Sequence, residues 1–369
     1  MSPAGPLSAA LPVFPWDTLA EATATARAHP DGIVDLSVGT PVDPVAPIIR
    51  EALATASSAP GYPTTAGTPA LRDAAVNALR RRYGITDLAA DAVLPVIGTK
   101  ELIAWLPTLL NLGSGDLVVV PELAYPTYDV GARLARAEVV AADSLTQLGP
   151  RAPKLVYVNS PSNPTGAVLG VEHLRKVVEW ARRRGALVAS DECYLGLGWD
   201  PDAAPVSVLH PSVCDGDHTG LLAIHSLSKS SSLAGYRAGF VAGDPAVVAE
   251  LLAVRKHAGM MVPTPIQAAM VAALDDDAHE HVQRGLYARR RDVLLAAVRG
   301  AGFTVDHSEA GLYLWATRGE PCRDTVASLA ELGILVAPGE FYGARGARHV
   351  RMALTATDER IDAAVRRLA

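Results

Sequence analysis

The sequence holds five lysines, and one of them is placed to act as a chemically reactive amine. Lys229 lies in the serine-rich segment HSLSKSSSLAG, which begins within the apolar run LLAIHS (221–226). An amine that forms an imine must be held in place and must have a lowered pKa, which burial and a neighbouring cation provide. The other four precede a strand or lie in predicted helices: Lys100, Lys154, Lys176 and Lys256. Taken alone, Lys229 could equally be an exposed loop lysine.

Asp191 ends the apolar run LVASD (187–191), and a carboxylate there could keep a pyridine nitrogen protonated, so that the ring accepts carbanion electrons. Tyr194 follows it closely, and Asn163 begins the segment NPTG; both side chains could bond to a ring phenolate. The plainer interpretations are an Asp that caps a loop and an Asn-Pro-Thr-Gly turn. Lys229, Asp191 and Tyr194 are the candidate catalytic residues.

A third set of residues has the character of a phosphate site. Gly98, Thr99 and the backbone N–H of Lys100 open a predicted helix, and helix N-termini bind phosphate. Ser226 and Arg237 would complete the shell, because the guanidinium offers a planar fork of donors. Together, the candidate amine, carboxylate and phosphate-binding residues predict a cofactor with a phosphate, a ring nitrogen and an aldehyde. Pyridoxal 5′-phosphate has all three groups.

These residues follow predicted strands, where open α/β sheets bind ligands at the carboxyl ends. Strands are expected at 33–41 (running into a turn), 93–97, 117–120, 138–142, 155–159, 187–191, 221–226 and 238–243. Helices are expected at 69–83, from Lys100, at 173–185 with Gly185 as C-cap, at 245–258 and at 265–299. Strands separated by helices predict an α/β fold with a mostly parallel sheet.

The pattern changes after Gly302 to short strands and helices, which indicates a smaller α+β unit. We therefore expect a large cofactor-binding domain over 46–275. The N-terminal segment 1–45 and the tail 276–369 are expected to form a small domain. At the join, the acidic run DDDAHEH could be read as metal ligands, but its spacing favours a solvated acidic helix, so we predict no metal.

Composition excludes several other classes of protein. The 369 residues carry a net charge of −6, with Lys+Arg 33 against Asp+Glu 39, so nothing favours a nucleic-acid partner. Prolines interrupt the longest uncharged stretches, which argues against a membrane span. Three widely spaced cysteines and the absence of a recognisable export signal predict a cytoplasmic protein. Glycine-rich nucleotide motifs, H-E-x-x-H and G-x-S-x-G are all missing from the sequence.

The motifs S-x-x-K, N-P-T-G, D-E-x-Y and G-x-R-x-G, in this order, resemble the fold-type I pyridoxal-phosphate enzymes, specifically the class I/II aminotransferases. The resemblance implies that Tyr125 stacks on the cofactor ring and that Tyr62 reaches the phosphate of a neighbouring subunit. It also implies that Arg351 forks onto the substrate α-carboxylate beside Gly39, with Asn163 as a further substrate contact. A homodimer acting on amino acid and 2-oxo acid substrates follows from the same resemblance.

Longer segments are similar to the succinyldiaminopimelate aminotransferases: PVFPWDTLAEA, GTKELIAWLPTLL, PELAYPTYDVGARLA and HSLSKSSSLAGYRAGF. This implies glutamate with 2-oxoglutarate as one substrate pair and N-succinyl-LL-2,6-diaminopimelate with its 6-oxo product as the other, in lysine biosynthesis. The alternatives are an aminotransferase for aspartate, an aromatic amino acid or unblocked diaminopimelate, and a C–S lyase. A transcription regulator with this fold would need an attached DNA-binding domain, for which we expect too few residues.

Overall fold

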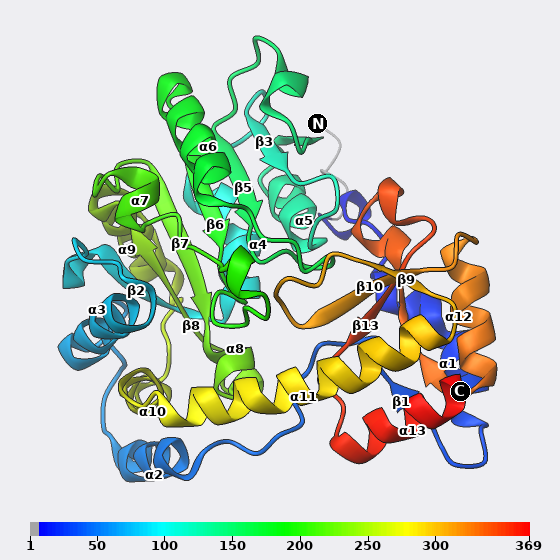
Figure 1. The fold of residues 1–369 in the computed structure, drawn as a ribbon. Helices are drawn as coiled ribbons and strands as arrows, with labels where there is room; N and C mark the ends of the chain where they lie inside the picture. The colour runs from blue at the N-terminus through cyan, green and yellow to red at the C-terminus, as the bar shows by residue number, and fades with distance from the viewer. Residues whose placement is uncertain (1–6) are drawn as a thin grey trace.

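A seven-stranded sheet forms the centre of the computed structural model, which describes residues 7–369 (Figure 1). Its strands lie in the order β2-β8-β7-β6-β5-β3-β4, and only β8 runs antiparallel to its neighbours within this sheet. Their bounds are β2 (Val93–Ile97), β3 (Leu117–Val120), β4 (Glu138–Ala141), β5 (Leu155–Asn159), β6 (Leu187–Asp191), β7 (Leu221–Ser226) and β8 (Ala238–Gly243). The prediction of an α/β fold with a mostly parallel sheet is confirmed.

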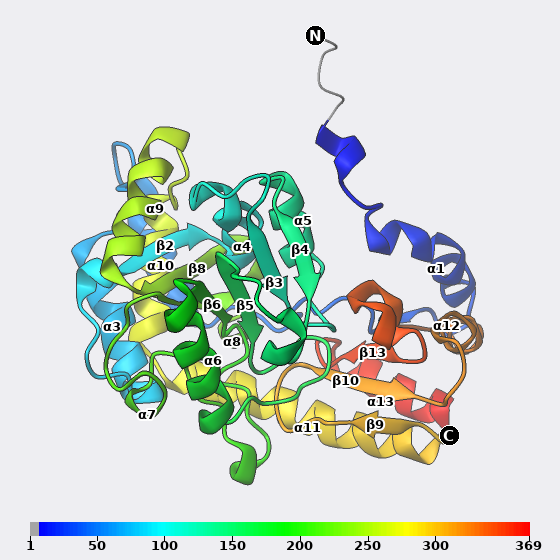
Figure 2. The same ribbon diagram turned by 90° about the horizontal axis from the view of Figure 1, so that it is seen from above.

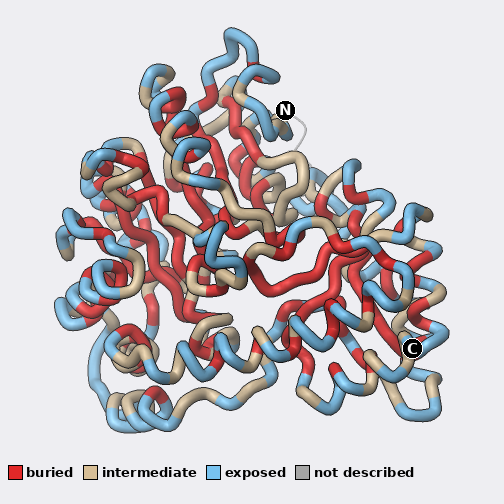
Figure 3. The backbone as a smooth tube through the Cα atoms, in the orientation of Figure 1, coloured by how far each residue is buried: buried red, intermediate tan, exposed pale blue. Residues whose placement is uncertain are grey.

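Helices cover both faces of this sheet because both faces of its strands are apolar. In β3, Leu117 and Val119 join one core cluster, whereas Val118 and Val120 join the other. The first cluster includes α3 (Pro69–Tyr83), α6 (Val171–Arg184), α7 (Pro211–Cys214) and α10 (Thr264–Asp275). The second includes α4 (Thr99–Leu109), α5 (Thr127–Leu134) and α9 (Pro245–Ala258). Figure 3 shows the buried strands lying between exposed outer helix faces.

A second, antiparallel sheet with the order β12-β13-β10-β9 has its own core. Its strands are β9 (Thr304–Asp306), β10 (Tyr313–Thr317), β12 (Ala337–Pro338) and β13 (Val350–Ala353). Beside it, β1 (Val34–Asp35) pairs in parallel with β11 (Ile334–Leu335), which joins the N-terminal segment to the tail. Figure 2 shows α1 (Ala20–Arg27) against α12 (Cys322–Glu331) on the side away from the large sheet. The domain boundaries at 46 and 275 stay a prediction.

Four further helices complete the fold. They are α2 (Pro47–Thr55), α8 (Leu227–Ser230), α11 (Ala278–Gly300) and α13 (Asp358–Leu368). Of these, α11 leads from the large sheet to the small one. Short 3-10 turns are η1 (Leu7–Ala10), η2 (Pro15–Leu19), η3 (Ala56–Ser58), η4 (Ala90–Ala92), η5 (Leu145–Leu148), η6 (Pro201–Ala203), η7 (Ala234–Tyr236), η8 (Gly339–Tyr342) and η9 (Ala344–Gly346). Over residues 7–369, no helix combines the length and apolar character that a membrane crossing requires.

The helix expected at 265–299 is broken into α10 and α11, and the acidic run supplies the break. The Asp276 side chain accepts hydrogen bonds from the backbone N–H of Ala278 and His279, which caps the start of α11. Asp277 instead pairs with arginines of α3, so the run is not simply a solvated helix face. In the described part of the chain, no three His, Cys, Asp or Glu side chains are grouped to hold a metal ion.

We predict that Asp277→Asn destabilises the protein by about 1–2 kcal/mol, because two charge-assisted contacts lose their anion. Asp277 Oδ2 lies 2.6 Å from Arg81 Nε, and Oδ1 lies 2.6 Å from Arg82 Nε. The Arg81 guanidinium holds the pKa of Asp277 well below its ordinary range. Urea unfolding at pH 7 measures the effect, with the exposed neighbour Asp275→Asn as matched control. Equal stability of the two variants would contradict the prediction.

Candidate active site

The polar residues singled out in the sequence gather where β5, β6 and β7 end. Lys229 lies in α8, whose N-cap Ser226 is the last residue of β7. Lys229 Nζ donates a hydrogen bond to the main-chain oxygen of Gly39, which belongs to the N-terminal segment. Burial lowers the pKa of Lys229, and the positive charges of Arg351 and Arg237 act in the same direction. A lowered pKa favours the neutral amine, which is the nucleophilic form.

Asp191 ends β6 in a buried position, 5% exposed. Its Oδ2 accepts a hydrogen bond of 2.8 Å from the Tyr128 hydroxyl, and its Oδ1 accepts one of 3.2 Å from the backbone N–H of Cys193. Burial raises the pKa of Asp191, and the contacts in the described chain that oppose this shift are hydrogen bonds rather than a cation. The carboxylate is therefore held in place and lacks a positive partner from the chain.

Arg351 enters the site from β13 of the second sheet and is 3% exposed. Its Nη1 donates to Asn163 Oδ1 at 2.9 Å, and its Nη2 donates to the Ser37 main-chain oxygen at 2.7 Å. Within residues 7–369, its Nε is buried without a hydrogen-bond partner. The guanidinium carbon lies 3.9 Å from the ring centroid of Tyr313. A buried cation that contacts only neutral groups is suited to receive an anion.

The Arg237 guanidinium approaches the Gly98 backbone closely just after the end of β2. Gly98 has φ +72°, a conformation that favours glycine, and a Cβ atom there would lie 2.2 Å from Arg237 Nη2, so any larger residue would displace the guanidinium. Thr99 begins α4, and its Oγ1 lies 3.4 Å from Cys193 Sγ. The helix N-termini at Gly98 and Ser226 and the Arg237 fork together offer donors for an anionic group.

The two predicted aromatic side chains of the site lie close to these groups. Tyr194 is buried, and its hydroxyl is 3.0 Å from the hydroxyl of Tyr313. Tyr125 packs edge-on against Tyr128, with ring centroids 5.9 Å apart. Burial raises the pKa of Tyr125 to about 12, so its hydroxyl stays protonated at neutral pH.

Two predicted residues lie apart from this cluster. The Tyr62 side chain is 98% exposed on the loop before α3. The Lys100 side chain is exposed, with its Nζ 5.4 Å from the ring centroid of Phe14, so only its backbone belongs to the start of α4. Sequence reasoning missed Tyr128 and Tyr313 as site residues. The repeated tyrosine in the segment AYPTY was a signal for the first of them.

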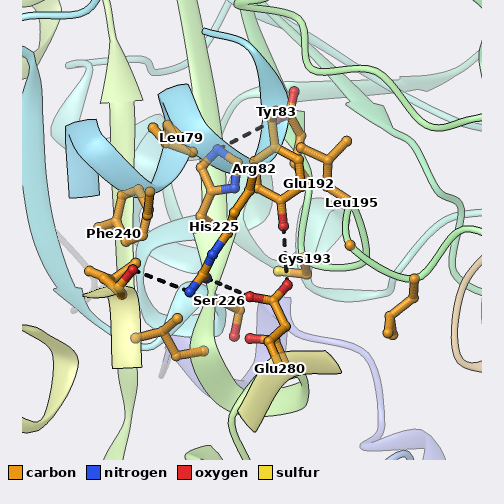
Figure 4. Close-up of a pocket in the computed structure, with 16 residues that line it drawn as sticks. Leu79, Arg82, Tyr83, Glu192, Cys193, Leu195, His225, Ser226, Phe240 and Glu280 are labelled. Atoms are coloured by element: carbon orange, nitrogen blue, oxygen red, sulfur yellow. Dashed lines mark hydrogen bonds and ion pairs between the residues drawn. The ribbon is translucent and has the colours of Figure 1, made fainter. Parts of the chain in front are cut away.

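A cavity of about 40 Å³ lies behind the strand ends, and Figure 4 shows Glu192 and His225 facing each other in it. Glu192 Oε2 and His225 Nε2 are 3.4 Å apart, and neither atom has a hydrogen-bond partner. The Tyr83 ring stacks on His225, while Arg82 reaches across to Glu280 Oε2 at 2.5 Å. Burial raises the pKa of Glu192 to about 7 and lowers that of His225 to about 3.

We predict that Glu192→Gln makes the apoprotein gain stability relative to wild type by about 2 kcal/mol between pH 5 and pH 8. A carboxyl whose pKa rises on folding, here from 4.5 to about 7, destabilises the folded state progressively as pH rises through that window. His225, whose pKa is lowered, costs stability below about pH 6.5 in both proteins, so its effect cancels in the comparison. Denaturant unfolding at both pH values is the measurement. The exposed Glu331→Gln serves as control, and a pH-independent difference would refute the prediction.

The sheet topology and the likeness to solved aminotransferases define a class of protein, the fold-type I pyridoxal-phosphate-dependent enzymes. The chain belongs to the family "Aminotransferase class I and II", whose model matches residues 31–368. It is accordingly an aminotransferase that depends on pyridoxal 5′-phosphate.

Similar proteins span almost the whole chain. A probable aminotransferase of Mycobacterium tuberculosis, Rv1178, is 78% identical over 99% of this chain and 87% of its own length. The 4-dedimethylamino-4-oxo-anhydrotetracycline transaminase OxyQ of Streptomyces rimosus is 60% identical over 97% of this chain and 99% of its own. The solved structure of N-succinyldiaminopimelate aminotransferase from Mycobacterium tuberculosis has a TM-score of 0.84 and 26% identity, covering 95% of this chain and 97% of its own.

Proposed function

We propose that this aminotransferase moves an amino group between glutamate and 2-oxoglutarate on one side and N-succinyl-LL-2,6-diaminopimelate and its 6-oxo product on the other, in lysine biosynthesis in the cytoplasm. The observation that carries the α-amino acid part of this proposal is Arg351. It is a buried guanidinium with an unpaired Nε, and it lies beside Asn163. Its fork matches the two oxygens of an α-carboxylate.

The residues present fit pyridoxal 5′-phosphate, because the donor set has places for both of its charged groups. Asp191, a buried carboxylate without a cation from the described chain, would hold the ring nitrogen in its protonated form. Arg237 and the two helix N-termini would hold the phosphate with Gly98, Thr99, Ser226 and the N–H of Lys100. Tyr125 would stack on the ring, and Tyr194 and Asn163 would bond to the ring oxygen.

When bound, the cofactor supplies an aldehyde that exchanges amino groups and a ring that accepts electrons. Lys229 would anchor the cofactor. As a neutral amine, Lys229 would also take the proton from the substrate Cα and deliver it to C4′, the carbon of the cofactor's aldehyde group. Arg351 with Asn163 would fix the α-carboxylate, which orients that proton toward the Lys229 amine. The Gly39 main-chain oxygen, which accepts from Lys229 Nζ, would help hold the amine in place.

The distal part of the substrate has a groove available to it. A depression of about 550 Å³ reaches from Tyr125 and Tyr342 to the N-terminal segment. The Tyr342 ring centroid is 5.0 Å from the Arg351 guanidinium carbon, so the groove begins beside the proposed carboxylate site. Arg323 lines it and is paired with Glu340 at the surface. We propose Arg323 as a partner for the succinyl carboxylate, in line with the likeness to N-succinyldiaminopimelate aminotransferase.

A second candidate is the amination of a ring ketone. The 60% identity to the transaminase named for 4-dedimethylamino-4-oxo-anhydrotetracycline favours it. The groove also has apolar walls suited to a ring system, including Val13, Pro121, Val139 and Phe341. Substrate turnover, rather than similarity, separates the two candidates.

The first test is a substrate panel with glutamate as donor. We expect kcat/KM for the succinylated 6-oxo substrate to exceed that for the oxo acids of aspartate, aromatic amino acids and unblocked diaminopimelate by at least about tenfold, because these substrates lack the succinyl carboxylate that would pair with Arg323. Arg323→Gln should remove about tenfold of this preference and leave the glutamate half-reaction unchanged. Lys229→Ala is the inactive control.

Other outcomes of the panel assign other functions. Preferred amination of the anhydrotetracycline ketone would establish the second candidate and overturn the first. A preference for aspartate or an aromatic substrate would leave only the general aminotransferase activity. Turnover without any oxo acid, with release of a thiol, would identify a C–S lyase.

The second test concerns a homodimer. Tyr62, whose side chain is 98% exposed, is available to reach the phosphate in a partner subunit. We predict that mixing an inactive Tyr62→Ala variant with an inactive Lys229→Ala variant restores up to about a quarter of wild-type activity. One site of a mixed two-fold dimer then receives both intact residues, while the other receives neither. Absence of rescue after confirmed subunit exchange would show that Tyr62 does not act across a dimer.

A further inference from the structure

One face of α11 presents three side chains at four-residue intervals to residues 229–232, the end of α8 and the two residues after it, which we call the Lys229 turn. His279 Nε2 lies 2.8 Å from the Ser231 hydroxyl oxygen. The Tyr287 hydroxyl donates to the main-chain oxygen of Lys229 at 3.1 Å. Helix residues four apart lie on the same face, so a single straight element sets both contacts.

The middle member of this series is Gln283, which receives a hydrogen bond from the Ser232 hydroxyl at 3.2 Å through its Oε1. Its Nε2 donates to Asp43 Oδ2 at 2.8 Å. Both ends of the amide are thus used, one toward the Lys229 turn and the other toward the N-terminal segment. Asp43 lies four residues after Gly39, whose main-chain oxygen accepts from Lys229 Nζ.

The series is anchored at both ends. At its start, His279 Nδ1 lies 2.8 Å from Asp276 Oδ2, which fixes the orientation of the imidazole beside the Ser231 hydroxyl. Beyond its end, Arg290 makes two contacts of 2.6 and 2.7 Å with Asp43 and one of 2.6 Å with Asp358 of α13. Figure 1 shows α11 running along the lower side of the molecule, from α8 near the large sheet to α13 near the small sheet.

The contacts at the turn are buried, so water does not readily replace them. Ser231 is 2% exposed, Gln283 6% and Tyr287 0%. Broken hydrogen bonds at such places leave unpaired polar groups, and this makes the arrangement stiff. The position of the Lys229 main chain is therefore tied to α11, and through Asp43 and Arg290 to the N-terminal segment and the tail.

We propose that His279, Gln283 and Tyr287 are positioning residues that hold the Lys229 turn at the depth where the amine faces the two arginines and Gly39. The inference rests on the proposed role of Lys229 as the reactive amine. Releasing the turn lets Nζ move toward water and away from the positive charges that lower its proton affinity. The charged and titratable groups that act on Lys229 are Tyr313, Cys193, Arg351 and Arg237.

The test measures the Lys229 amine directly in the apoprotein, by pH-dependent acetylation and mass spectrometry of its peptide. We expect His279→Ala to raise the Lys229 pKa by at least half a unit, which slows labelling about threefold at a fixed pH below that pKa. The matched control is His281→Ala, because His281 is exposed and bonds only to Asp277 of its own helix turn. The same variants with bound cofactor should show the corresponding shift in the pH midpoint of the visible absorption band.

Two smaller substitutions replace His279→Ala in this test if that variant folds poorly. Ser231→Ala and Tyr287→Phe each delete a single hydroxyl, and each should shift the Lys229 pKa upward with a circular dichroism spectrum like that of wild type. Lower melting temperatures with an unchanged Lys229 pKa would overturn the inference and leave α11 a purely structural support. Borohydride fixation of the cofactor on a lysine other than Lys229 in the wild type would instead overturn the proposed function.

Discussion

Arg351 is a buried cation that bonds only to neutral oxygens within the described chain, and the geometry of the site depends on keeping it there. A charge removed from water is costly unless it is paired, so the surrounding structure must hold the guanidinium rigidly. Pairing of β13 with β10 and β12 supplies that rigidity, since Arg351 lies opposite both Trp315 and Ala337. Because Nε has no hydrogen-bond partner among the described residues, an anion would form a new hydrogen bond on that side of the guanidinium.

The same constraint explains why the site is built from both sheets. Lys229 and Asp191 follow strands of the large sheet, whereas Arg351 belongs to the small one. The N-terminal segment crosses between them, where the Ser37 oxygen meets Arg351 and the Gly39 oxygen meets Lys229. A Cβ atom on Gly39 would lie 2.2 Å from the Tyr313 hydroxyl, so the approach of this segment requires glycine. A shift between the sheets would therefore move Gly39 and Arg351 relative to the Lys229 amine.

Local sequence patterns predicted most of the fold. Each apolar run of the large sheet became a strand, because both of its faces find an apolar partner. The break at Asp276 and Asp277 escaped prediction, because Asp276 caps α11 locally while Asp277 pairs with arginines of α3 that lie nearly two hundred positions earlier in the chain. Tyr313 was missed for a related reason. Strand alternation makes it a core residue, and only the crossing of Arg351 over its ring makes it part of the site.

The sequence by itself determined the motifs at the strand ends and their order, and with them the family and its cofactor. Such motifs are local, because a helix N-terminus or a left-handed residue depends on its immediate neighbours. The tertiary structure alone decided that Asn163 meets Arg351, 188 positions away, and that Ser37 meets it from 314 positions away. It also decided that the Tyr62 side chain is exposed rather than packed against its own chain. These contacts depend on how two sheets and the segment between them pack, and periodicity within one element carries no information about that packing.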